Sequence, residues 1–182
     1  LWIVPGESEA PASATHILRL DPGLAFGTGT HPTTHLCLEW IDSHDFSSQR
    51  VIDYGCGSGV LGIAAAIKGA ASVVCVDNDP QALTATDDNA ERNNVQDVIN
   101  SMLPGEFSAR DADVVLANIL AAPLIELAPR LAGAVNAGGA LVLSGILEEQ
   151  AEEVRAAYLA DFPGMEVRVL DGWVLLTGTR PE

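Results

Sequence analysis

The chain has 182 residues, of which 48% are hydrophobic and 19% charged, and these proportions favour one folded domain over a disordered segment. Its formal net charge is −16 and its nine Lys and Arg residues never stand side by side, which argues against a nucleic-acid binder, because such proteins usually carry a basic patch. No apolar stretch approaches the roughly twenty residues of a membrane span, and Cys37, Cys56 and Cys75 form no CxxC pair, which argues for the reducing cytoplasm and against a metal site.

The first residues read LWIVPGESEAP, an apolar start that runs into a polar segment containing proline. This composition is typical of a linker. We expect residues 1–15 to be the remnant of a linker from an N-terminal domain, and residues 16–182 to form one domain.

Apolar strands and amphipathic helices alternate along most of the chain. Strands are predicted at residues 51–54, 72–77, 97–103, 113–118 and 140–146, and helices at residues 59–68, 80–92, 120–131 and 147–158. The tail, MEVRVLDGWVLLTGT, alternates on both sides of Asp171-Gly172, which indicates a hairpin.

Strands that alternate with helices predict an α/β fold with a mostly parallel sheet, ending here in an antiparallel hairpin. Ligands of such sheets bind beyond the carboxyl ends of the strands. We therefore expect Gly55–Gly59, Asp77, residues 101–105 and Asn118 to lie close together in space.

The glycine-rich segment after the first of these strands has two interpretations. Gly57–Gly62 matches GxGxxG, and Asp77 follows Gly57 by twenty residues, as in dinucleotide-binding proteins, where the acid binds the ribose. Asp53-x-Gly55-x-Gly57-x-Gly59 also resembles the first motif of S-adenosylmethionine-dependent methyltransferases. Because both cofactors contain an adenosine, a nicotinamide-dependent oxidoreductase and a methyltransferase both remain possible from this segment.

Asn118-Ile119-Leu120 closes the strand at residues 113–118. In methyltransferases that act on nitrogen, an Asn at this place commonly begins an Asn-Pro-Pro-aromatic motif, whose Asn and backbone carbonyl accept hydrogen bonds from the target NH group. The prolines and the aromatic are absent here, so a flipped base would find no stacking platform. This absence argues against a nucleic-acid target.

Several segments together resemble one family, the bacterial ribosomal protein L11 methyltransferases. They are LDPGLAFGTGTHPTTHLCLEW, VIDYGCGSGVLGIAA, VDNDPQAL, DNAERN, DVVLANIL and LVLSGIL, within roughly residues 18–180. The resemblance implies a Rossmann-like, seven-stranded methyltransferase fold and a separate N-terminal domain that grips the substrate. It implies methyl transfer from S-adenosyl-L-methionine to lysine ε-amines and the N-terminal α-amine of a basic large-subunit ribosomal protein. Family cofactor contacts carry over to Thr34, Gly55, Asp77 and Asn118.

Methyl transfer from a sulfonium is a direct displacement by an amine lone pair, so Cys56 is not needed as a nucleophile. We expect Asn118 to orient the amine. Thr30-His31-Pro32 reads as a helix start, which we favour over a general-base role for His31. A methyltransferase for another protein or a small molecule remains the alternative.

The stretch LAFGTGTHPTTHL at residues 24–36 is interpreted as a lid and wall over the cofactor. Gly27 and Gly29 would give it a mobile backbone, and Phe26 could cover an apolar part of the ligand. Thr33 and Thr34 fall in the first turn of the following helix, with Thr34 as the expected direct contact.

Overall fold

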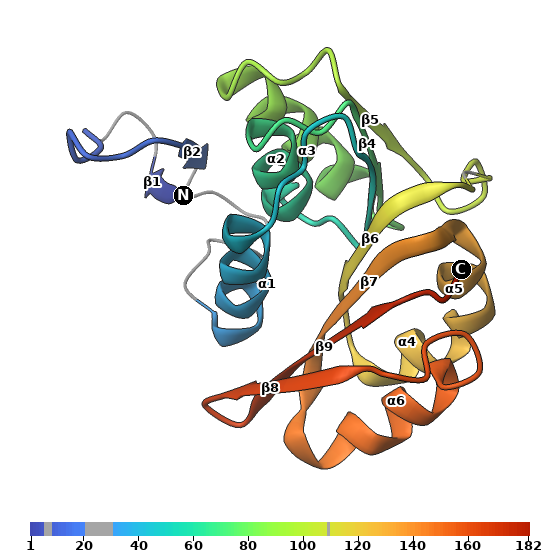
Figure 1. The fold of residues 1–182 in the computed structure, drawn as a ribbon. Helices are drawn as coiled ribbons and strands as arrows, with labels where there is room; N and C mark the ends of the chain where they lie inside the picture. The colour runs from blue at the N-terminus through green and yellow to red at the C-terminus, as the bar shows by residue number, and fades with distance from the viewer. Residues whose placement is uncertain (6–8, 21–30, 109) are drawn as a thin grey trace.

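A seven-stranded sheet forms the centre of the computed structural model, which describes residues 1–5, 9–20, 31–108 and 110–182 (Figure 1). The order is β5-β4-β3-β6-β7-β9-β8. These strands are β3 (Arg50–Tyr54), β4 (Ser72–Val76), β5 (Ile99–Met102), β6 (Ala112–Asn118), β7 (Val135–Leu147), β8 (Glu166–Leu170) and β9 (Trp173–Thr179). The five strands from β3 to β7 are parallel, and β9 runs antiparallel to both β7 and β8. The predicted α/β fold is therefore confirmed.

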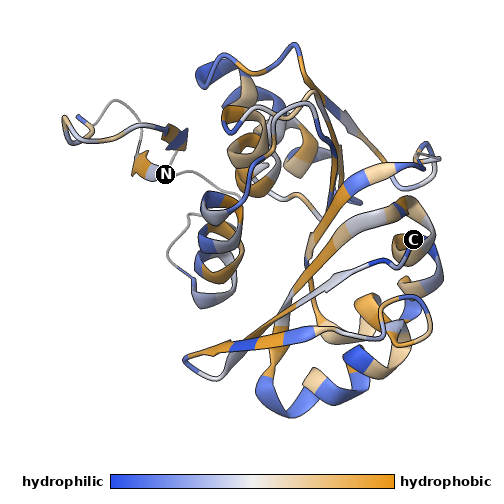
Figure 2. Cartoon of the chain, in the orientation of Figure 1, coloured by the Kyte–Doolittle hydropathy of each residue, from blue (hydrophilic) through white to orange (hydrophobic). Residues whose placement is uncertain are grey.

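Helices cover both faces of the sheet, because central strands such as β6 consist mostly of apolar residues (Figure 2) and are buried along most of their length. They are α1 (Pro32–Ser43), α2 (Val60–Ile67), α3 (Pro80–Arg92), α4 (Ala121–Glu126), α5 (Ala128–Ala134) and α6 (Ala151–Tyr158). Two clusters of buried hydrophobic residues result. One lies under α1 and α2 and includes Leu36 and Ile63. The other lies under α4 and α6 and includes Leu124 and Tyr158.

The single helix predicted for residues 120–131 is wrong, because the structure divides it into α4 and α5 at Leu127. Pro129 has no N–H to donate to the carbonyl of Ile125, and its ring clashes with that carbonyl in a continuous helix. Two other boundaries differ. A 3₁₀ turn at Glu148–Gln150 precedes α6, and β7 begins at Val135 rather than at residue 140.

The predicted hairpin is confirmed, with β8 and β9 joined by Asp171 and Gly172. Both turn residues have positive φ, 51° and 76°, as a two-residue turn of the type I′ class requires. This tight turn places Trp173 at the very start of β9, beside the end of β7, where it pairs with Leu147.

A second, two-stranded sheet was not foreseen. It pairs β1 (Trp2–Pro5) with β2 (Ile17–Leu20) in parallel, at the left of Figure 1. Leu18 and Leu20 are buried, and the side chain of Asn93, just after α3, accepts a hydrogen bond from the Arg19 N–H and donates one to the Arg19 carbonyl. Residues 2–5 of the expected linker thus form a strand, while a linker origin for residues 1–15 stays a prediction.

The helices of the described residues are all too short or too polar to cross a membrane.

Candidate functional site

A cavity of about 520 Å³ opens at the carboxyl ends of β3, β4 and β6. Thr34, Gly55, Asp77 and Asn118 all line it, so the four residues singled out from the sequence come together from four separate elements. Pro104, from the expected segment at residues 101–105, lines it as well. The rule that ligands bind at this edge of a parallel sheet therefore located the cavity correctly.

The glycine loop and Asp77 hold each other in place. The N–H groups of Gly55 and Cys56 both donate to the carbonyl of Val76, at distances of 2.7 and 3.1 Å. One Asp77 carboxylate oxygen accepts the Gly57 N–H at 2.9 Å, and the other accepts the Asp79 N–H at 3.0 Å. The acid at the end of β4 is thus fixed at the cavity by the loop after β3 and by the start of α3.

Asp53 is the buried acid of this site, only 1% exposed at the end of β3. Its Oδ2 accepts the Gly62 N–H at 2.8 Å, whereas its Oδ1 is buried without a hydrogen-bond partner among the described residues. Burial raises the pKa of this carboxyl to about 7, against the lowering effect of the Gly62 hydrogen bond, and the nearby Asp77 charge raises it further. The sequence placed Asp53 in a motif but did not show that one of its oxygens lacks a partner.

Asn118 is linked to the first turn of α1. Its Nδ2 donates to Oγ1 of the fully buried Thr34 at 3.3 Å, across 84 positions of the chain. This contact assigns the amide NH₂ group to Thr34, which leaves the Asn118 Oδ1 as an acceptor at the cavity.

His31 caps α1, as its position before Pro32 predicts. Its Nδ1 accepts the Thr33 N–H at 3.4 Å and lies 2.9 Å from the Thr33 hydroxyl oxygen. Its ring packs edge-on against Trp173 with 4.9 Å between centroids, and both rings line the cavity. Trp173 was not predicted as a site residue, although its place directly after a tight turn is visible in the sequence. Residues 24–30 of the expected lid, with Phe26, Gly27 and Gly29, lie outside the described residues, so the lid stays a prediction.

Cys56 also lines the cavity, as a buried residue of the glycine loop whose sulfur lies 3.4 Å from the Thr86 hydroxyl oxygen. In the part of the chain that the structure describes, no three His, Cys, Asp or Glu side chains gather as a metal-ligand set.

Comparison with known proteins identifies the family. The model of the family described as ribosomal protein L11 methyltransferase (PrmA) matches residues 1–181. The ribosomal protein L11 methyltransferase of Pseudomonas putida (strain GB-1) is 56% identical over 99% of this chain, and this chain spans 62% of that relative's length.

Two solved structures share the fold. The ribosomal protein L11 methylase of Lactobacillus delbrueckii subsp. bulgaricus superposes with a TM-score of 0.87 at 34% identity, covering 99% of this chain and 94% of that one. An RNA methyltransferase from Salinibacter ruber, in complex with S-adenosyl-L-homocysteine, has a TM-score of 0.61 at 21% identity and covers 81% of this chain and 90% of its own. The chain belongs to the ribosomal protein L11 methyltransferase family.

Proposed function

We propose that this chain binds S-adenosyl-L-methionine in the cavity at the carboxyl ends of the strands. There it transfers the methyl group to lysine ε-amines and the N-terminal α-amine of the large-subunit ribosomal protein L11, in the cytoplasm. The observation that carries the proposal is the convergence of the glycine loop, Asp77 and the Thr34–Asn118 pair on one cavity. Family membership supports this substrate, and it disfavours the nicotinamide-dependent alternative.

The residues of the cavity fit this cofactor. The buried Asp53 Oδ1 lacks a partner among the described residues, and the ammonium of the cofactor's amino-acid part is a donor of the right charge for it. Gly55 lines the cavity with its main chain, and Asp77 can accept hydrogen bonds from ribose hydroxyls. Among the described residues, the Thr34 hydroxyl acts as an acceptor, from Asn118, and could donate its hydrogen to the ligand. When bound, the cofactor supplies an activated methyl group on a sulfonium.

The residues of the chain orient the neutral amine that receives the methyl group. A free lysine has a pKa of about 10.4, and burial beside a cation disfavours the ammonium form. Two acceptors at the cavity suit the amine's N–H groups: the Asn118 Oδ1 and the main-chain carbonyl of Ile119. Pro123 stands four residues after Ile119 and has no N–H, so α4 cannot use that carbonyl as a helix would. Within the described ranges, no hydrogen bond is made to the Ile119 oxygen.

Asn118→Ala tests this arrangement in an assay of labelled methyl transfer to purified ribosomal protein L11. We expect kcat to fall about 10²-fold, because the amine loses one of its orienting acceptors. Asn136→Ala is the matched control, since Asn136 makes its hydrogen bonds to the Asp111 carbonyl and the Asp113 carboxylate, away from the cavity. An Asn118→Ala variant with unchanged turnover would refute the orienting role.

The cofactor is tested separately by calorimetry, with S-adenosylhomocysteine compared with NADH. The transfer assay should cover a wide range of L11 concentrations, so that weak substrate binding is not mistaken for the absence of transfer. Binding of S-adenosylhomocysteine without any transfer to L11 would leave the cofactor assignment standing and reject the substrate.

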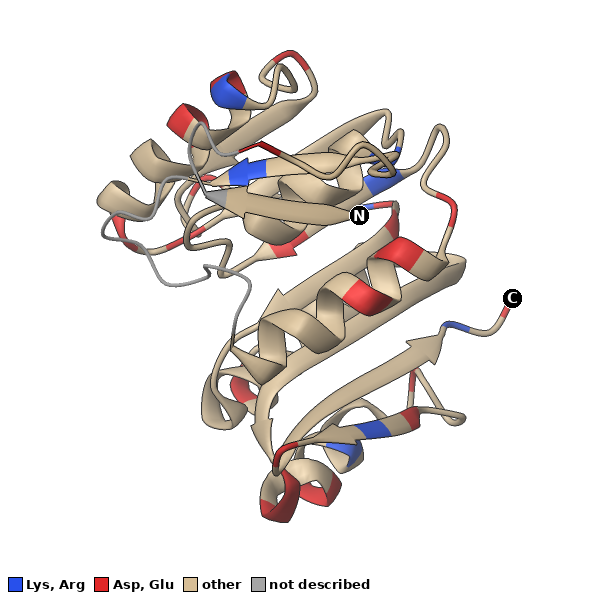
Figure 3. Ribbon diagram, turned by 90° about the vertical axis from the view of Figure 1, so that its left-hand side faces the viewer, with Lys and Arg blue, Asp and Glu red and all other residues tan. Residues whose placement is uncertain are grey.

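The acidic surface suits a basic substrate. The sequence has twenty-five acidic and nine basic residues, and the ribbon of Figure 3 carries more red, acidic segments than blue, basic ones. Long-range attraction between opposite charges speeds encounter and is screened by salt. We expect the association rate with L11 to fall as salt rises, and a flat response would contradict this role.

A further inference from the structure

Gly145 lies where β7 departs from regular pairing. Along β7, Leu143 pairs with Leu176 of β9 and Ile146 with Val174, so β7 carries one residue more than its partner between these points. This is a β-bulge, a feature that re-aims the chain locally. The Ser144 hydroxyl donates to the Val174 carbonyl at 2.9 Å and so satisfies part of the interrupted ladder.

The bulge brings β7 against the turn that follows β6. Gly145 has a φ of +85°, and a Cβ built on it would stand 2.3 Å from the Ile119 oxygen and 2.7 Å from the Ile119 carbonyl carbon. Atoms at such distances overlap, and both belong to the main chain, so no side-chain rotation could relieve the contact. Any side chain at this position must therefore displace main chain, either the peptide group between Ile119 and Leu120 or the bulge of β7.

We propose that Gly145 is a positioning residue for methyl transfer. Its missing side chain lets the Ile119 carbonyl lie at the cavity, in the place from which it can accept a hydrogen bond from the target amine. This inference rests on the function proposed above, and adds that a residue on β7 determines where the second acceptor stands. Gly145, Ile119 and Pro123 all line the cavity, which is the geometry the inference requires.

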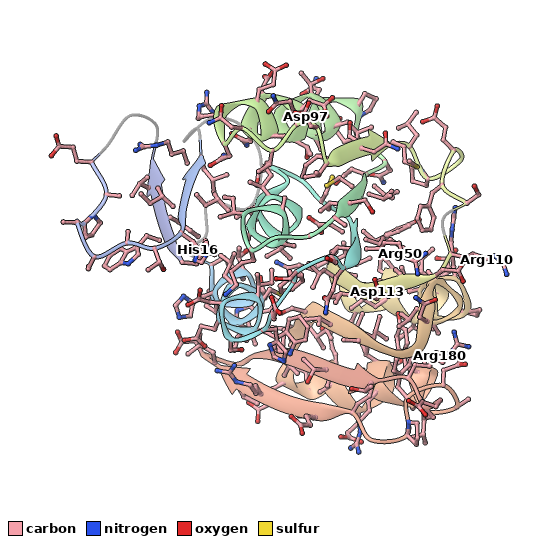
Figure 4. All side chains as sticks on the ribbon, turned by 45° about the horizontal axis from the view of Figure 1, so that its top comes forward. His16, Arg50, Asp97, Arg110, Asp113 and Arg180 are labelled. Carbon is pink, nitrogen blue, oxygen red and sulfur yellow. The ribbon has the colours of Figure 1, made fainter. Side chains whose placement is uncertain are left out.

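Gly145→Ala is the direct test, with two controls on the same strand. Gly138→Ala places Ala at a φ of +75° with nothing within 4 Å, so it adds backbone strain alone. Gly139→Ala adds a contact alone, since its Cβ would meet the Val135 Cγ1 at 2.8 Å and the Asp113 oxygen at 3.0 Å. Both controls lie at the other end of the sheet, where Asp113 and Arg50 lie side by side (Figure 4).

We expect Gly145→Ala to lower kcat about 10²-fold while its affinity for S-adenosylhomocysteine changes by less than about fivefold, because a displacement of about 1 Å misplaces the acceptor but not the cofactor. Both controls should keep wild-type kcat. Hydrogen exchange of residues 117–124 should be faster in Gly145→Ala alone. Unchanged exchange, or faster exchange with unchanged kcat, overturns the inference.

A second variant covers the case in which Gly145→Ala does not fold. Pro123→Ala supplies an N–H four residues after Ile119, so the helix can extend backward and take the carbonyl. We expect a severalfold lower kcat with no loss of thermal stability, because Ala favours the helix. Wild-type kcat in this variant would count against the inference. If the wild-type chain transfers no methyl group to L11, the proposed function fails, while the exchange experiment still decides whether Gly145 fixes the Ile119 peptide.

Discussion

Gly55 and Gly145 stand on opposite sides of Ile119 and meet different parts of it. Both have positive φ, 79° and 85°. A Cβ on Gly55 would lie 2.2 Å from the Ile119 Cγ2, a side-chain atom, whereas a Cβ on Gly145 would collide with the Ile119 main chain. A crowded side chain can be shortened by a second substitution, but a crowded main chain cannot. Glycine is therefore required at position 55 because of the Ile119 side chain, and at position 145 because of the Ile119 main chain. A second substitution, at Ile119, should relieve only the first contact.

The largest expected effect comes from combining each glycine variant with Ile119→Ala. Gly55→Ala and Gly145→Ala should each destabilise the fold by about 2–5 kcal/mol, from positive φ and overpacking together. In double-mutant cycles by urea denaturation, Ile119→Ala should recover about 1–3 kcal/mol in Gly55→Ala, because it removes Cγ2. It should recover nothing in Gly145→Ala. If Ile119→Ala restored the same free energy of unfolding in both glycine variants, the Ile119 side chain would be the source of both clashes.

The next largest effect concerns Asp53, two residues before Gly55, whose folded-state pKa is about 7 against an ordinary value of 3.8. The folded chain then holds a proton that the unfolded chain releases, so stability falls as pH rises from about 4 to about 7 and is level above that. This difference corresponds to at most about 4 kcal/mol. Asp53→Asn should abolish it and make the free chain more stable than wild type at pH 8 in urea denaturation.

Protonation of Asp53 should also make cofactor affinity depend on pH. The cofactor's ammonium favours the Asp53 carboxylate, so affinity for S-adenosylhomocysteine should rise with pH up to about 7 and then level off. Calorimetry across this range should show the dependence in wild type and in Asp97→Asn, an exposed control, but not in Asp53→Asn. A pH dependence that survives Asp53→Asn would assign it to another group.

Gly138→Ala should have the smallest effect, and it isolates backbone strain. With a φ of +75° and open space around its Cβ, it should cost about 1–2 kcal/mol in urea denaturation, the cost of the left-handed conformation alone. A larger loss would mean that strain, rather than contact with Ile119, accounts for most of the effect at Gly55 and Gly145.

The sequence predicted the site residues best where each one directly follows a recognisable strand. Gly55, Asp77 and Asn118 each follow an apolar strand directly, and the topology of a parallel sheet brings strand ends together. The role of Gly145 was hidden, because it depends on the register of β7 against β9, which lie 26 or more positions apart along the pairing. The division of α4 from α5 has a local cause, Pro129, which is visible in the sequence but was not used in predicting the helix at residues 120–131.

The pairing of β1 with β2 could not be predicted from local sequence patterns either. Its partners lie 15 residues apart in the sequence, and its outer side is completed by a side chain from elsewhere in the chain.

That side chain is Asn93, whose amide matches both main-chain groups of Arg19, at 2.7 Å each. Arg19 is the residue through which β2 would pair with a further strand on this side. An exposed strand edge is a template for association with other copies of a chain, and proteins commonly obstruct it with charge, proline or a covering element. Here one amide occupies the place of a neighbouring strand at Arg19, so it covers this edge of β2 at that residue and anchors the small sheet to the end of α3.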